Sequence, residues 1–152
     1  MATSFLGQLL TGTHNFGASP TRAGATADSF KAALYLASAT VDASTTAYSV
    51  TGEVSGAGYT AGGVAVTNAS APTATNASAT AGVGYWTPSA SLVYTTVTLA
   101  TAFDAVMIYN STQGDKTVSV HTFGSQTVTA GTFTLTMPAN STVAALLRLA
   151  TT

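Results

Sequence analysis

The chain contains no cysteine among its 152 residues. This absence excludes disulfide bonds, thiolate metal sites and a cysteine nucleophile. The sequence also lacks an apolar run of about 18 residues or more, the length that a membrane-spanning helix needs. Because the segment from Met1 to Leu10 has no basic residue either, we expect neither a signal peptide nor a membrane partner.

Charged side chains are scarce: four are basic and five are acidic, 6% of the chain, where about a quarter is usual for soluble domains. On the roughly 7,000 Å² surface expected for this mass, that is about one charge per 800 Å², the area that one partner contributes to a standard interface. A surface of Thr, Ser, Asn and Gly suits a long-lived assembly, although a secreted domain with a polar, uncharged surface would look similar. We expect no direct nucleic-acid partner, because the basic residues are scattered: Arg22, Lys31, Lys116 and Arg148.

Alternation of apolar and polar residues is the strongest pattern that is present. It predicts half-buried strands at 29–37 and at 132–137, the latter with Phe133, Leu135 and Met137 facing inward. The segment from Phe103 to Asn110 is apolar on both faces, which predicts a central strand. Further strands are expected at 64–66, 91–100, 117–123 and 126–129. The predicted fold class is therefore all-β, a β-sandwich or a jelly-roll-like fold.

Turn residues indicate how these strands connect. The segment from Asn110 to Lys116 predicts a hairpin loop, and Ala130-Gly131 predicts a second hairpin. We interpret Thr101-Ala102 as a turn between two separate strands. Residues 67–84 are nearly all Ala, Thr, Ser, Asn and Gly, which predicts a long loop or a weakly patterned pair of strands.

Both ends of the chain differ from this pattern. The segment from Ser4 to Leu10 predicts a short amphipathic helix with Ser4 as its N-cap, followed by an extended arm. The segment from Ser141 to Ala150 fits either a strand or a helix, and the β-branched residues at its start favour the strand. We predict an N-terminal helix or arm at 1–27, a β-sandwich domain at 28–140 and an extended C-terminal strand or arm at 141–152.

No motif in the sequence predicts an enzyme. Two histidines, five carboxylates and many hydroxyls are present, but no Gly-x-Ser-x-Gly elbow surrounds any serine. We interpret His121 as structural and Asp104 as a satisfied carboxylate at the Thr101-Ala102 turn. Because there is no cysteine and the histidines lie far apart in sequence, we expect no metal site and no cofactor. The glycines do not form a Gly-x-Gly-x-x-Gly loop that opens a helix, so we expect no dinucleotide or phosphate loop. We also expect no small-molecule substrate.

The adjacent aromatic residues Tyr85 and Trp86 offer an alternative of another class. Aromatic rings on a surface stack against sugar faces, so this pair would suit a carbohydrate-binding β-sandwich module. The alternative is that both rings pack in the core or in an interface, where tyrosine and tryptophan are common.

Two parts of the chain carry motifs that are similar to those of a known family. The motifs lie within residues 28–63 and 105–139: Asp28–Tyr35, Ser38–Thr40, Ala43–Tyr48, Gly52–Gly63, Ala105–Thr112, Phe123-Gly124 and Thr132–Ala139. In these segments the chain resembles small structural proteins, of head or tail, from the virions of tailed bacteriophages. The resemblance implies a place in the virion, assembled in the host cytoplasm, and no catalysis. The chain departs from the family at 68–101 and at 140–152.

The function that we expect from these observations is that of a capsid decoration or cement protein, which forms a dimer or trimer and binds the major capsid protein. A tail, neck or fibre accessory protein of the same kind of particle is the alternative. We predict the interface residues from apolar side chains near the two ends, which a single domain would struggle to bury: Phe5, Leu6, Leu9, Leu10, Leu146, Leu147 and Leu149.

Overall fold

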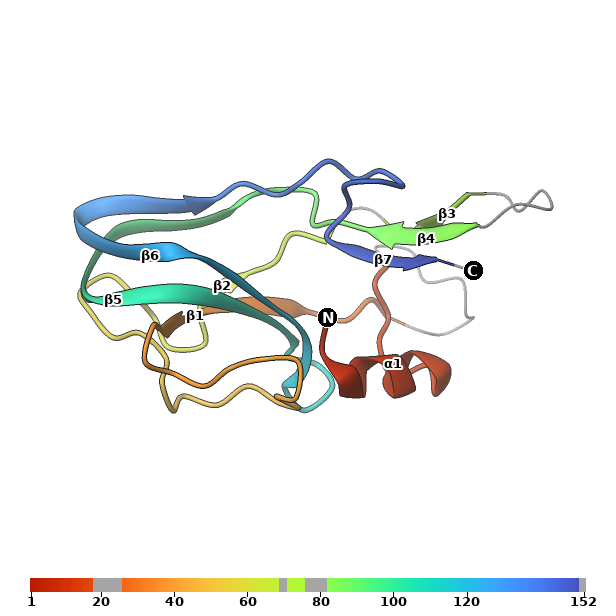
Figure 1. Ribbon diagram of the computed structural model, residues 1–152, viewed down its shortest axis with the longest axis horizontal. Helices are drawn as coiled ribbons and strands as arrows, with labels where there is room; N and C mark the ends of the chain where they lie inside the picture. Colours follow the sequence, from red (N-terminus) through yellow and green to blue (C-terminus); the bar gives the residue numbers. More distant parts are fainter. Residues whose placement is uncertain (18–25, 69–70, 76–81, 151–152) are drawn as a thin grey trace.

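The fold is mostly β, with two antiparallel sheets and one short N-terminal helix in a sandwich-like arrangement (Figure 1). The computed structural model describes residues 1–17, 26–68, 71–75 and 82–150. Its elements are α1 (Thr3–Leu10), β1 (Phe30–Leu36), β2 (Val64–Ala65), β3 (Thr73–Ala74), β4 (Val83–Trp86), β5 (Leu92–Asn110), β6 (Lys116–Leu135) and β7 (Leu147–Ala150). The sequence-based prediction of an all-β fold is therefore confirmed.

The larger sheet has the strand order β2-β1-β5-β6, and β5 lies in its interior. β1 pairs with the second half of β5, for example Leu34 with Val106 and Ala33 with Met107. Because this part of the sheet is buried on both faces, the residues here are apolar at nearly every position. The prediction that Phe103 to Asn110 forms a central strand is confirmed.

The two faces of this sheet contribute to two apolar clusters. One face contributes Leu34 and Ile108 to the main core, and the opposite face contributes Tyr35 and Met107 to a smaller cluster. The loop between β1 and β2 covers the smaller cluster, with the Tyr48 ring stacked on Tyr109 at 4.6 Å. This long, glycine-rich loop is therefore part of the packed structure.

β5 and β6 form one long antiparallel ribbon, which corrects two of the predicted turns. Thr101-Ala102 lies inside β5 and Ala130-Gly131 lies inside β6, so neither forms a turn between separate strands. The turn-prone residues instead lie at bulges: the register shifts between Val97 and Leu99, opposite Ala130, and between Leu99 and Phe103, which includes Thr101-Ala102. Asp104 is consequently a half-buried residue within a strand and does not end one.

The bulges let the ribbon bend back over itself, as the left side of Figure 1 shows. Phe133 from the far half of β6 meets Phe103 of β5 edge-to-face, with ring centroids 5.0 Å apart. The Tyr94 hydroxyl donates to the Ala32 carbonyl oxygen of β1 at 2.8 Å. A single bent ribbon thus supplies strands to both layers around the main core, and the alternation predicted for Thr132 to Leu135 is confirmed.

α1 is confirmed as a helix, but Ser4 is not its N-cap. The N-cap position is Ala2, which makes no side-chain capping bond. Tertiary contacts take the place of a cap, because the Ala2 N–H donates to the Val118 carbonyl at 2.9 Å and the Thr3 N–H to the Ala43 carbonyl at 2.8 Å. An eight-residue helix is marginal alone, so docking on β6 stabilises it.

The smaller sheet has the order β3-β4-β7 and contains the C-terminal strand. The prediction of a strand at the C-terminus is confirmed for Leu147–Ala150, whereas Ser141 and Ala145 close a single turn before it. The strand-pair alternative for residues 67–84 is confirmed at β3 and β4, where Thr73 pairs with Tyr85. No helix in the described part of the chain is long and apolar enough to cross a membrane.

The described parts of both predicted arms pack against the domain. Phe5 and Phe16 from the N-terminal segment and Leu147 from the C-terminal segment belong to the same core cluster as Phe30 of β1. Arg22 lies outside the described residues. The division of the chain at residues 27 and 140 stays a prediction.

Candidate functional site

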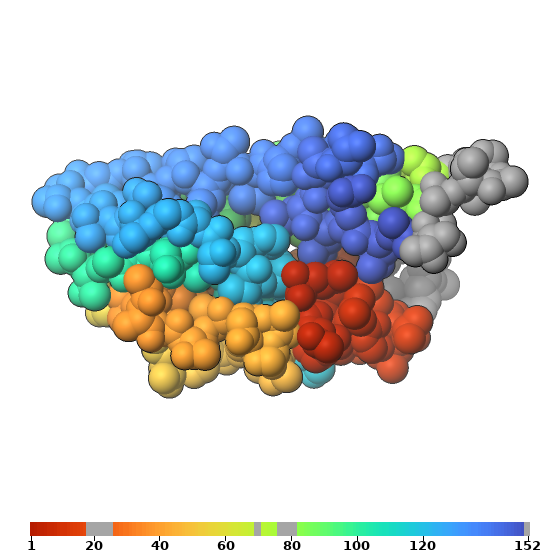
Figure 2. All heavy atoms as spheres, viewed as in Figure 1, coloured from red at the N-terminus to blue at the C-terminus, as the bar shows by residue number. Residues whose placement is uncertain are grey.

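An apolar cleft of about 240 Å³ lies between α1 and the β3-β4-β7 sheet, at the end of the molecule where the N-terminal helix and the C-terminal strand come together. Figure 2 shows α1 (red) and the C-terminal segment (dark blue) adjacent on this end. Six of the nine residues that the sequence singles out line the cleft: Phe5, Leu9, Tyr85, Trp86, Leu147 and Leu149. We call this site the apolar cleft.

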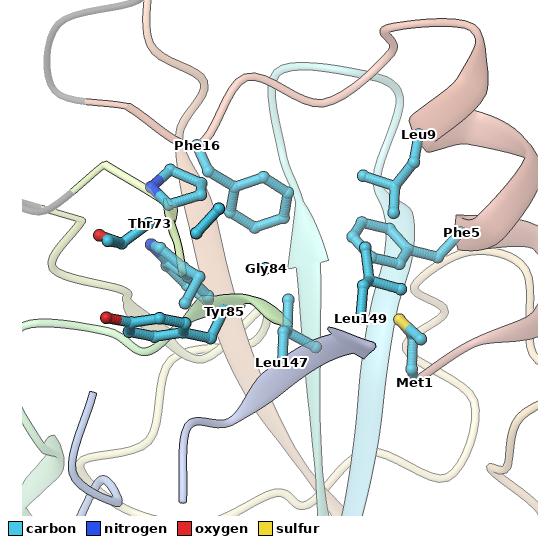
Figure 3. Close-up of a pocket in the computed structure, with 12 residues that line it drawn as sticks. Met1, Phe5, Leu9, Phe16, Thr73, Gly84, Tyr85, Leu147 and Leu149 are labelled. Carbon is cyan, nitrogen blue, oxygen red and sulfur yellow. The ribbon is translucent and has the colours of Figure 1, made fainter. Parts of the chain in front are cut away.

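Helix spacing and strand register place these side chains. Phe5 and Leu9 are four residues apart, so they lie on one face of α1 and form one wall. On the opposite wall, β4 pairs with β7, with Gly84 beside Leu149 and Trp86 beside Leu147. Figure 3 shows Phe5 and Leu9 facing Leu147 and Leu149 across the cleft.

Stacked aromatic rings close the inner end of the apolar cleft. The Phe16 ring lies 4.6 Å from Phe30 and 4.8 Å from Trp86, measured between centroids, and Phe5 meets Phe16 edge-to-face at 5.8 Å. Aromatic pairs in these geometries stabilise a core beyond their buried area. The aromatic floor is therefore a fixed part of the core.

Trp86 is not a surface aromatic, which corrects the sequence-based hypothesis. Its side chain is only 2% exposed, and its indole N–H donates to the Asn68 side-chain oxygen at 2.9 Å. The ring has no exposed face for a sugar, because Phe16 and Phe30 pack against it. Tyr85 is half-buried at the wall of the cleft.

The predicted interface residues separate into buried and exposed groups. Phe5 and Leu147 are 2% and 7% exposed, so they belong to the protein's own core and are not free for contacts with a partner. Leu9 and Leu146 are partly buried against that core. Leu6, Leu10 and Leu149 are 45%, 92% and 44% exposed. Their contact role stays a prediction. Met1 and Leu149 line the cleft, and Leu6 and Leu10 lie on the adjoining side of α1; we call these four residues the apolar rim.

A polar network near the start of β1 was missed by the sequence analysis. The Asp28 carboxylate accepts hydrogen bonds from the Asn110 amide at 2.7 Å, the Asn15 N–H at 2.8 Å and the Gln113 amide at 3.0 Å. Asp28 and Asn110 are both buried, although they lie 82 residues apart. The network joins the N-terminal segment to the β5–β6 hairpin loop.

His14 extends this network to α1. Its Nδ1 lies 2.9 Å from the Asn110 amide nitrogen, which can only donate, and its Nε2 lies 2.7 Å from the Gln8 side-chain oxygen, which can only accept. Both contacts are satisfied by the neutral ring with its proton on Nε2. Burial lowers the pKa of His14, with a smaller opposing effect from Asp28.

A second buried carboxylate, Glu53, holds the loop between β1 and β2. It accepts hydrogen bonds from the hydroxyls of Tyr48 and Tyr59, each at 2.7 Å, and from the Gly62 N–H at 2.8 Å. Burial and the bond to Glu53 raise the pKa of both tyrosines above their usual range. All three donors hydrogen-bond to Glu53, so this network fixes the loop on the sheet.

The remaining candidate for chemistry is the Ser119–His121 pair. The two side chains lie two residues apart on one face of β6, and the His121 Nε2 lies 3.0 Å from the Ser119 hydroxyl. Burial lowers the pKa of His121. Among the described residues no carboxylate hydrogen-bonds to His121, so the orienting group of a triad is missing there. In the same residues, no group of three or more His, Asp or Glu side chains is placed to hold a metal ion.

Comparisons with protein-family models, with curated proteins and with solved structures find no match for this chain. The resemblance to virion proteins of tailed phages therefore stays a prediction from the motifs in the sequence.

Proposed function

We propose that this chain is a non-enzymatic structural protein of a tailed-phage virion, and that it decorates the capsid by docking on the major capsid protein through the apolar cleft and its rim. The observation that carries the proposal is that Met1 and Leu149, both more than one-third exposed, line a cleft that is itself apolar, while Leu6 and Leu10 are exposed on the adjoining side of the helix that forms one of its walls. Exposed apolar groups that cluster mark interaction surfaces, whereas single ones need no explanation.

The rim has enough unburied area to contribute to binding. Leu10 is 92% exposed, and complete burial of a leucine side chain contributes about 1.5–3 kcal/mol. Leu6 and Leu149 each have a little under half of their area still to bury. Since association itself costs several kcal/mol, the rim alone supports a modest affinity, and a lattice of capsid subunits would raise it through many neighbouring contacts.

The scarcity of charge supports the same proposal. No charged residue occurs between Thr117 and Leu147, a segment that includes most of β6. Such a surface can be covered by a neighbour without stranding a charge away from water. A protein that binds only the assembled shell stabilises the shell by mass action, and this is how a cement protein acts.

Self-association as a dimer or trimer is part of this proposal. The finer description of the fold as a β-sandwich or jelly roll is part of it as well.

The carbohydrate-binding alternative has lost its main support, because the Trp86 ring is buried. A tail, neck or fibre protein would present the same apolar rim, so copy number in the particle distinguishes it from a decoration protein.

Replacing a rim leucine tests the docking surface. We expect Leu10→Ser to reduce binding to heads assembled without this chain by about fivefold or more, because the substitution removes most of one buried leucine. Co-sedimentation of the purified protein with such heads measures the binding. Val50→Ser is the matched control, since Val50 is 65% exposed in the loop between β1 and β2, outside the cleft. Equal binding by the two variants would contradict docking at the rim.

A further inference from the structure

The outer edge of β6 is an open sheet edge. β6 ends the strand order of the larger sheet, so among the described residues β5 is its only neighbour strand. The start of β6 is covered, because the Val118 carbonyl accepts from Ala2 and the Thr117 N–H donates to the Thr46 carbonyl. From Thr132 to Leu135, no backbone hydrogen bond joins β6 to a described residue outside β5. On the far side of this stretch, no other described strand pairs with the backbone of β6.

This edge lacks the features by which monomeric proteins protect such strands. Short length, charged side chains and proline all discourage pairing at an edge. β6 has 20 residues, carries no charge after Lys116, and meets its first proline only at Pro138, beyond its end. The bulge at Ala130 bends β6. Beyond the bulge, residues from Gly131 to Leu135 still pair with β5, as far as Leu92.

Several core side chains along this edge are only partly buried. Of the hydrophobic side chains that pack against the main core and remain only partly buried, five lie on β6 or just after it: Phe123, Val128, Phe133, Leu135 and Met137. Thr132 and Thr134 alternate with them and are exposed on the outer face. A strand added beside β6 would cover the inner side chains only if it carried the same alternation of apolar and polar residues.

We infer that the occupant of this edge is β6 of a second copy of the chain, paired antiparallel across a twofold axis near Thr134. In that register Phe133 of each copy faces Leu135 of the other on the core side, and Thr134 faces Thr134 on the outer side. The strand is self-complementary because it carries no charge that would oppose its own copy. The inference rests on the self-association that is part of the proposed function, and it does not depend on binding to a capsid.

Single-cysteine variants test this pairing directly, because the protein has no cysteine of its own. Thr134→Cys places one thiol at the twofold axis, where directly opposite residues have Cα atoms about 4.5–5.5 Å apart, within the range of a disulfide. Val93→Cys is the matched control. Val93 is exposed and lies on the neighbouring strand β5, where it pairs with Thr134 of β6. In the proposed dimer two copies of residue 93 lie three strand spacings apart, about 14 Å, too far for a bond.

After mild oxidation, a non-reducing gel should show most of the Thr134→Cys protein as a disulfide-linked dimer and the Val93→Cys protein as monomer.

Sedimentation of the cysteine-free protein should show a dimer. Thr134→Lys should weaken this dimer by about tenfold to a hundredfold, since two like charges then meet at the axis. Thr95→Lys, also exposed but on β5, should leave the dimer intact. A monomeric wild type, equal cross-linking of the two cysteine variants, or a dimer unaffected by Thr134→Lys would each overturn the inference. Because no heads are present, these outcomes are separate from the binding measured with Leu10→Ser.

Discussion

At the scale of single residues, the molecule is held by a few buried polar groups whose partners are distant in sequence. Asp28, Asn110 and His14 connect three segments through bonds of 2.7–2.9 Å. Gly63 also depends on a residue distant in sequence: its φ is +72°, and a Cβ there would lie 1.7 Å from the Ala32 carbonyl oxygen. None of these contacts could be predicted from the sequence, because each depends on a pairing that only the tertiary fold creates.

The two histidines should make stability depend on pH. Burial lowers the pKa of both His14 and His121 below the usual 6.5, so the unfolded chain binds more protons than the folded chain as pH falls through that region. The contribution of the neutral histidines to stability is therefore complete above about pH 6.5 and declines as pH falls below it toward the folded-state values. For His14, burial is the main cause of the lowered pKa; Asp28 opposes it and the charge of Lys116 adds to it.

Urea denaturation at a series of pH values between 8 and 5 measures this effect. The denaturation midpoint should decrease below pH 6.5, and the decrease should be smaller in His14→Gln and in His121→Gln, which cannot titrate there. A midpoint that is constant down to pH 5 would show that neither histidine is held in its neutral form.

At the scale of elements, the regular patterns in the sequence predicted β1, the second half of β5, the alternation in β6 and the helix α1. The continuous β5–β6 ribbon was not predicted, because residues such as Ala130-Gly131 suit a turn and a bulge equally well. Pairing with Val97, more than thirty residues earlier, determines which of the two forms. Long-range packing likewise buries Trp86 and Phe5, so the sequence could identify the residues of the cleft but not which of them are exposed.

α1 should depend on one side chain for its attachment. Phe5 is 2% exposed and contacts Phe16 in the aromatic floor of the apolar cleft, whereas the helix alone is too short to be stable. Phe5→Ala should lower the free energy of unfolding by about 3–5 kcal/mol. Leu10→Ala, at a position that is 92% exposed on the same helix, should change it by less than about 0.5 kcal/mol. Denaturation with urea, followed by circular dichroism, compares the two, and similar losses would mean that α1 is not held through Phe5.

At the scale of the whole molecule, we assign partners to two surfaces of the described structure. The apolar cleft and its rim lie where α1 and β7 meet, and the open edge of β6 lies along the bent ribbon. We propose that the capsid covers the first surface and that another copy of the chain covers the second. Both assignments rely on a surface with very few charges, which was already evident in the composition.

The most direct test of the proposed function is the number of copies of this chain in purified phage particles, relative to the major capsid protein, measured by quantitative mass spectrometry. A decoration protein should be present in near-stoichiometric amount. A few copies to a few tens per particle would contradict a role on the capsid shell and favour the tail or neck, and complete absence would contradict a place in the virion.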